Sequence, residues 1–211
     1  MRFAFAVAVC HLIVAGGAAA AQTPSRGYAE VVAQSAFGNV TSQSFGAEVG
    51  VRIAPALHVF AEVGRTRDTS PAALGQRAQL IAGFLAQTHS GVAFTVKQPA
   101  TFGVAGLRYG KVVGRVEPYV LGGGGVARVR KDVTFSASGA DVTSTLSQLG
   151  VTLGTDLSGS ETKTMITAGG GVAWNAWQRL VFDLQFRYGR IMTSDEGLNV
   201  SRAGIGVGFR F

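Results

Sequence analysis

The feature that most constrains this chain is an alternation of apolar residues with glycine or polar residues, which recurs along most of its length. In residues 45–53 the apolar side chains occupy every second position, and the positions between them hold Gly46, Glu48, Gly50 and Arg52. The last eleven residues repeat the pattern, with Ala203, Ile205, Val207, Phe209 and Phe211 on one face. A period of two is typical of β-strands that have one apolar face and one polar face.

The alternation predicts eight strands. They are the segments 27–37, 45–53, 57–64, 100–110, 116–129, 166–174, 180–188 and 201–211, of which 27–37, 100–110 and 116–129 are the least regular. Each is close to the ~9–11 residues that a tilted strand needs to cross a bilayer. The two longest links are 67–98, where residues 71–87 favour a short helix, and 130–161. Long links that alternate with short ones predict an antiparallel up-and-down barrel.

Composition removes several other classes of protein. The 211 residues include 30 Gly and one Cys, and only 15% of them are charged. Low charge with many apolar residues excludes intrinsic disorder, and a single Cys excludes a disulfide framework or a Cys-based metal site. The net charge is +7, but the basic residues are dispersed, so no nucleic-acid partner is predicted. After residue 21 no apolar run is long enough for a membrane helix, so a membrane protein of this sequence must be a closed barrel.

Residues 1–21 have the pattern of an export signal. Arg2 precedes an apolar run, and Ala19, Ala20 and Ala21 stand before Gln22 as in an A-x-A cleavage site. We therefore predict a secretory signal peptide over 1–21 and one barrel domain over 22–211. An uncleaved membrane anchor is the alternative, for which the strongly apolar run is short.

The alternation alone does not decide which face of the barrel points outward. A soluble lipocalin-type barrel turns its apolar face inward, whereas a membrane barrel turns it toward lipid. Glycine on the polar faces favours the membrane barrel, because it leaves room for long side chains in a narrow lumen. Charges of both signs are expected to pair there, namely Glu48, Arg52, Glu62, Arg108, Asp183, Arg187, Arg202 and Arg210. Aromatic residues near strand ends are expected in interfacial girdles, namely Tyr109, Tyr119, Trp174, Trp177, Tyr188 and Phe211.

The terminal strand carries a resemblance. With Phe211, Phe209, Val207 and Ile205 on one face, it resembles the C-terminal signal that the outer-membrane barrel assembly machinery recognises. With the export signal and the Gly-rich stretches 121–129 and 167–174, residues 22–211 resemble the small outer-membrane β-barrels of the OmpA-barrel and OmpX type. The resemblance implies an all-β, eight-stranded antiparallel up-and-down transmembrane β-barrel in the cell outer membrane. It also implies a monomer whose partners are outer-membrane lipids and the assembly machinery.

Basic residues are predicted at the outer ends of several strands. They are Arg65, Arg67, Arg128, Arg130, Lys131, Lys163 and Arg190. In this position they can pair with lipopolysaccharide phosphates, or they can form a merely solvated rim.

Residues with catalytic potential are few. His58 lies on a polar strand face, where it is expected to hydrogen-bond within the lumen, and His89 is followed by Ser90 in a link. Neither histidine has a nucleophile in a position that the sequence can establish, and no metal-ligand spacing occurs. We predict no catalytic, metal or cofactor residues and a non-enzymatic role in envelope structure, adhesion or ligand binding through the long links. A lipid A-modifying enzyme with His58 or His89 as base, and a soluble lipid binder, remain alternatives.

Overall fold

The computed structural model describes residues 25–211 except 150–153, 155–156 and 194–196. The predicted signal peptide, 1–21, lies outside the described residues and stays a prediction. No helix in the described part of the chain is long and apolar enough to span a membrane.

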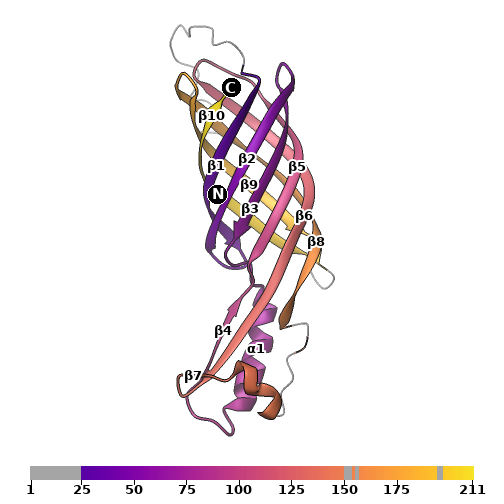
Figure 1. The fold of residues 1–211 in the computed structure, drawn as a ribbon, viewed down its shortest axis with the longest axis vertical. Helices are drawn as coiled ribbons and strands as arrows, with labels where there is room; N and C mark the ends of the chain where they lie inside the picture. The colour runs from indigo at the N-terminus through magenta and orange to yellow at the C-terminus, as the bar shows by residue number, and fades with distance from the viewer. Residues whose placement is uncertain (1–24, 150–153, 155–156, 194–196) are drawn as a thin grey trace, which may run out of the picture.

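Eight antiparallel strands form a closed ring (Figure 1). They are β1 (Gly27–Gly38), β2 (Ser42–Ala54), β3 (Leu57–Thr66), β5 (Ala100–Gly110), β6 (Val116–Ala137), β8 (Ser158–Trp177), β9 (Leu180–Ile191) and β10 (Leu198–Arg210). Each strand pairs with the next, and β1 pairs with β10 from Tyr28↔Arg210 to Gly38↔Val200, which closes the ring. The prediction of an all-β, eight-stranded up-and-down barrel is confirmed.

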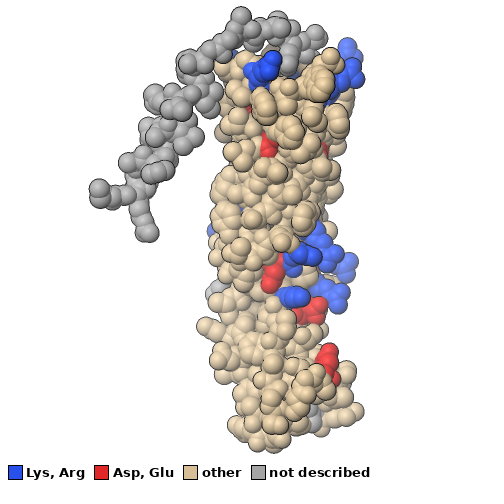
Figure 2. All heavy atoms as spheres, turned by 90° about the vertical axis from the view of Figure 1, so that its left-hand side faces the viewer, with Lys and Arg blue, Asp and Glu red and all other residues tan. Residues whose placement is uncertain are grey.

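The outer wall of the ring is apolar. Large hydrophobic side chains are exposed on the wall, for example Val31 on β1 and Leu184 on β9. The buried positions that alternate with them include most of the charged residues of the strands, for example Glu30 on β1 and Asp183 on β9. Figure 2 shows a wall almost free of charged side chains over much of its height. This arrangement is the reverse of a lipocalin-type barrel and is that of a transmembrane barrel, whose apolar band faces lipid.

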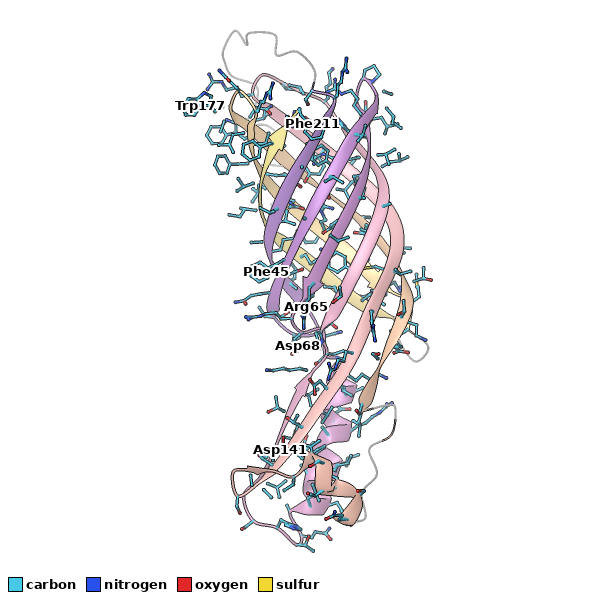
Figure 3. All side chains as sticks on the ribbon, viewed as in Figure 1. Phe45, Arg65, Asp68, Asp141, Trp177 and Phe211 are labelled. Carbon is cyan, nitrogen blue, oxygen red and sulfur yellow. The ribbon has the colours of Figure 1, made fainter. Side chains whose placement is uncertain are left out.

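Aromatic side chains border this wall, with one exception to the prediction. Trp174, Trp177 and Phe211 are exposed at the end of the ring that carries the short turns, where Figure 3 labels Trp177 and Phe211. Tyr119 is not in the girdle, because its side chain is only 5% exposed and points into the lumen. Tyr119 is the next residue after the outward-facing Pro118 on β6, so its side chain faces inward. The glycines at 122–125 interrupt the apolar–polar alternation of β6, and the sequence therefore did not show which face Tyr119 occupies.

The second long link is largely ordered structure, so the prediction of a loop over 130–161 is wrong for much of its length. Strand β6 continues to Ala137 and β8 begins at Ser158, so both extend beyond the ring. Val133 and Phe135 continue the buried–exposed alternation of β6 beyond the charged residues at 130–132. Those three charged residues interrupt the hydrophobic pattern, so the sequence did not predict that the strand continues. The strands therefore carry a projection away from the ring (Figure 1).

The projection also contains the predicted helix. Helix α1 (Ala72–Leu85) and strand β4 (Val92–Lys97) lie in the first long link, and β4 pairs with β6 from Val92↔Ala137 to Lys97↔Asp132. The two-residue β7 (Ala140–Asp141) and a 3₁₀ helix (Thr143–Leu149) follow β6. A separate hydrophobic cluster holds these parts together, namely Leu74, Ala78, Leu85, Val133, Phe135, Leu146 and Leu157.

Asp68 fastens the projection to the ring, at the position labelled in Figure 3. Its carboxylate accepts hydrogen bonds from the backbone N–H groups of Ser70 and Gln98, both at 2.9 Å. The backbone N–H of Thr69 donates to the carbonyl of Gln98, also at 2.9 Å. The segment between Ser70 and Gln98 therefore leaves and re-enters the ring at adjacent points.

Glycine permits close contact between β5 and β6. A Cβ added to Gly125 would overlap the backbone oxygen of Gly103, whereas one added to Gly75 on α1 would meet open space. We expect Gly125→Ala to lower the free energy of unfolding by about 1–3 kcal/mol, because the two strands must separate. Gly75→Ala is the control and should raise it by about 0.5–1 kcal/mol through helix propensity. Urea titration in detergent measures both; equal effects would contradict the close contact.

Candidate functional site

Glu62 on β3 is the centre of a buried charge network in the lumen. Its carboxylate accepts a hydrogen bond from Arg202 Nη1 at 2.7 Å and another from Arg187 Nη1 at 3.1 Å. Arg187 and Arg202 are 0% and 1% exposed, so this network is shielded from solvent. The three side chains come from β3, β9 and β10, and the ring closure brings them together across the lumen.

A second set of charges surrounds Arg108 on β5. Arg108 lies 3.7 Å from Glu48 and 3.6 Å from Asp183, and Glu48 also pairs with Arg187 at 2.6 Å. The guanidinium of Arg108 stacks on the ring of Tyr119 at 3.5 Å. A cation on an aromatic face is stabilised by the ring quadrupole, and more so when both are desolvated.

Neutral polar side chains complete the network, and sequence reasoning missed them. Tyr28 donates a hydrogen bond to Glu48 at 2.6 Å, and Tyr119 donates one to Asp183 at 2.7 Å. Gln185 accepts from Arg187 Nε at 2.7 Å, and Gln34 accepts from Arg202 at 3.3 Å. All four lie on the inward strand faces that also carry the charges. The alternation of odd and even positions that placed the charges in the lumen would therefore have placed these four side chains there as well.

Two arginines of the predicted network lie nearer the short-turn end. Arg210 pairs with Glu117 at 2.6 Å, a partner that the sequence did not single out. Arg52 is half-buried opposite His58 and forms no ion pair with any residue that the structure describes. Glu30 faces Glu48 across β1 and β2, and one of its buried carboxylate oxygens has no hydrogen-bond partner.

The lumen is therefore occupied by side chains along its length. Eight strands leave an interior just wide enough for side chains to fill, and here large charged and aromatic groups fill it. Buried ions need partners because desolvation is costly, and the carboxylates above supply them. The arrangement favours a stable plug of side chains over an open pore.

The two histidines lie in unrelated places. His58 is buried in the lumen, where its ring contacts Tyr28 edge-on at 5.8 Å. His89 lies between α1 and β4, where its Nδ1 is 2.9 Å from the hydroxyl of its neighbour Thr88. In the part of the chain that the structure describes, neither histidine is hydrogen-bonded to a serine or to a carboxylate. Among the described residues, no group of three or more His, Cys, Asp and Glu side chains has a geometry that suits a metal ion.

A basic pocket lies on the outside of the barrel, where the ring meets the projection. It has a volume of about 560 Å³, and its charged lining residues are Arg65, Arg128, Arg130, Lys131 and Asp132. Figure 2 shows Lys and Arg side chains gathered in a band at this height. Two of the other basic residues predicted at the outer strand ends have partners of their own. Arg67 donates to Gln43 at 2.6 Å, and Lys163 pairs with Glu161 at 3.1 Å.

Comparison with solved structures identifies the fold. Ail, the attachment invasion locus protein of Yersinia pestis, matches with a TM-score of 0.50 and 16% identity over 90% of this chain and 100% of its own. A major outer membrane protein from Thermus thermophilus matches with a TM-score of 0.52 and 11% identity over 88% and 99%. Neisserial surface protein A matches with a TM-score of 0.50 and 13% identity over 88% and 96%. The chain has the fold of the small outer-membrane β-barrels.

No family model and no curated protein matches the chain. Likeness at 11–16% identity establishes the barrel fold, whereas function has to be argued from the sites. In this barrel those sites are the filled lumen, the projection and the basic pocket.

Proposed function

We propose that the chain is a non-enzymatic, integral protein of the outer membrane that binds a partner at the cell surface through its projection. The observation that carries the proposal is the division of the molecule into two parts with different exteriors. The ring has an apolar wall and a filled lumen, and the projection has its own hydrophobic cluster outside that wall. The wall anchors the protein in lipid, and the lumen network keeps the anchor rigid.

The projection presents a surface suited to binding. Leu80 and Phe84 are exposed one helical turn apart on α1, on the side away from the cluster that holds the helix in place. Adjacent exposed apolar side chains on an ordered element are typical of protein–protein contact sites. Ail, an attachment invasion locus protein with this fold, is the precedent for a role in adhesion.

Excision of the helix and β4 tests this role. Because Thr69 and Gln98 are hydrogen-bonded neighbours, residues 71–97 can be replaced by a two-residue Gly-Ser linker that leaves the ring closed. We expect the variant to keep the heat-dependent gel mobility of a folded barrel, while cells that carry it attach to epithelial monolayers no better than cells without the protein. Leu80→Ser/Phe84→Ser should reproduce most of the loss without deleting any backbone.

The same cells separate this role from the alternatives. Unchanged attachment, with greater sensitivity to bile salts, would overturn the adhesion role in favour of envelope structure. Mass spectrometry of lipid A addresses catalysis. An acyl-chain change that requires the protein and disappears in His58→Ala or His89→Ala would overturn the non-enzymatic assignment.

A further inference from the structure

The basic pocket has more cationic groups than its own residues neutralise. Arg128 donates to the hydroxyl of Ser160 at 3.1 Å, and Lys131 lies 3.9 Å from Glu161. Arg65 and Arg130 form no ion pair with any residue that the structure describes. Asp132 is the one carboxylate in the described lining. The pocket therefore carries an excess of positive charge that an anion can neutralise.

The pairing of neighbouring strands creates this arrangement. Arg65 on β3, Thr101 on β5 and Arg128 on β6 lie in one row, because Arg65 pairs with Thr101 and Thr101 pairs with Arg128. Between β4 and β5 the chain turns at Pro99, whose carbonyl accepts the backbone N–H of Arg130 at 3.0 Å. Strands β4 and β5 both pair with the same edge of β6, and the break between them at Pro99 leaves a concavity in the outer wall. The concavity lies beside the row of Arg65, Thr101 and Arg128. Two guanidinium groups and a hydroxyl consequently face one concavity.

The pocket lies at the border of the apolar wall. Val63 and Val126 are exposed to the lipid side, and Arg65 and Arg128 are the next outward-facing residues along the same strands. Two residues of strand span about 6.6 Å, so the guanidinium groups lie just beyond the hydrocarbon band. Figure 3 shows Arg65 at the rim of the ring beside Phe45, at the end opposite Trp177. This is the depth at which lipid headgroups contact a membrane protein.

We infer that this pocket binds a phosphate group of a phosphorylated glycolipid in the outer leaflet. Arginine is suited to phosphate because its planar donors make bidentate, charge-assisted hydrogen bonds. The pocket opens on the lipid-facing side of the wall, so a lipid headgroup reaches it by lateral diffusion. The inference rests on the proposed placement in the outer membrane and is independent of the role of the projection.

Lipid retention in nanodiscs tests the inference. The intact protein is placed in phosphatidylcholine nanodiscs that contain bis-phosphorylated lipid A, and lipid A retained after detergent exchange is counted by native mass spectrometry. Arg65→Gln/Arg130→Gln is compared with Lys111→Gln/Arg115→Gln, which removes the same charge from exposed positions in the short β5–β6 turn. We expect the first variant to lose about tenfold or more in retention, because each lost guanidinium removes charge-assisted hydrogen bonds. The second variant should retain lipid A as the unaltered protein does.

Further arms identify the source of the phosphate. The unaltered protein should retain dephosphorylated lipid A poorly. Its retention should fall to the level that Arg65→Gln/Arg130→Gln shows with bis-phosphorylated lipid A. Equal retention of both lipids, or an equal loss in both double variants, would overturn the inference. Displacement of lipid A by millimolar inorganic phosphate would indicate a site for free phosphate, and displacement by soluble heparin a site for sulfated glycans; either result would overturn the lipid assignment. Leu80→Ser/Phe84→Ser keeps β4 and the break at Pro99 in place. It should therefore still retain lipid A, which separates this test from that of adhesion.

Discussion

Glu62→Ala should lower the free energy of unfolding by about 3–5 kcal/mol, because removal of one partner from a buried ion pair leaves the other charge uncompensated. In this barrel the Glu62 carboxylate pairs with both Arg187 and Arg202, so both buried guanidinium groups lose an ion-pair partner in the variant. Unfolding by guanidinium chloride in detergent micelles measures the change. The fluorescence of Trp174 and Trp177, the two tryptophans of the chain, reports it.

Glu30→Gln is the control for Glu62→Ala. Glu30 faces Glu48 across neighbouring strands and has a buried oxygen without a hydrogen-bond partner. Like charges opposite each other on a sheet face destabilise it, so neutralising Glu30 should leave the stability unchanged or raise it. A loss as large as that of Glu62→Ala would show that the lumen responds to any change of charge. Large, steady conductance of the unaltered protein in planar bilayers would contradict the filled lumen itself.

Leu184→Arg should prevent stable insertion or make folding into lipid vesicles less favourable by about 2–4 kcal/mol, the cost of arginine at the bilayer midplane of a barrel. Leu184 is 66% exposed at the middle of β9, between outward-facing neighbours Val172 and Ile205 on the adjacent strands. Insertion is followed by heat-dependent gel mobility after refolding into vesicles.

Leu80→Arg is the matched control for Leu184→Arg. Leu80 is the more exposed of the two, at 77%, but it lies on α1 in the projection rather than on the wall. The same change of leucine to arginine should therefore leave insertion unaffected. If both variants inserted equally well, the apolar wall would not face lipid, and a soluble barrel would have to be reconsidered.

Leu184 faces lipid on a strand and Leu80 lies on a helix in the projection, and the sequence predicts this difference only in part. The alternation around Leu184 predicts a strand with an outward apolar face, because the period of two follows from strand geometry. Residues 71–87 predict the helix, and the structure confirms it over Ala72–Leu85. The extension of β6 and β8 escaped prediction, because charged residues interrupt the hydrophobic pattern at the rim and only pairing with β4 and with each other continues the strands.

The pattern of residues by itself determined the barrel, its eight strands and the face on which each charge lies, because these depend on local alternation and link length. The tertiary structure alone decided which charges meet. Glu62 reaches Arg187 and Arg202 because ring closure places β3 across the lumen from β9 and β10, an arrangement set by strand stagger rather than by sequence separation. The basic pocket likewise exists only because β4 and β5 share one edge of β6 with a break at Pro99. Contacts between distant strands depend on the register of the whole ring, which no local pattern encodes.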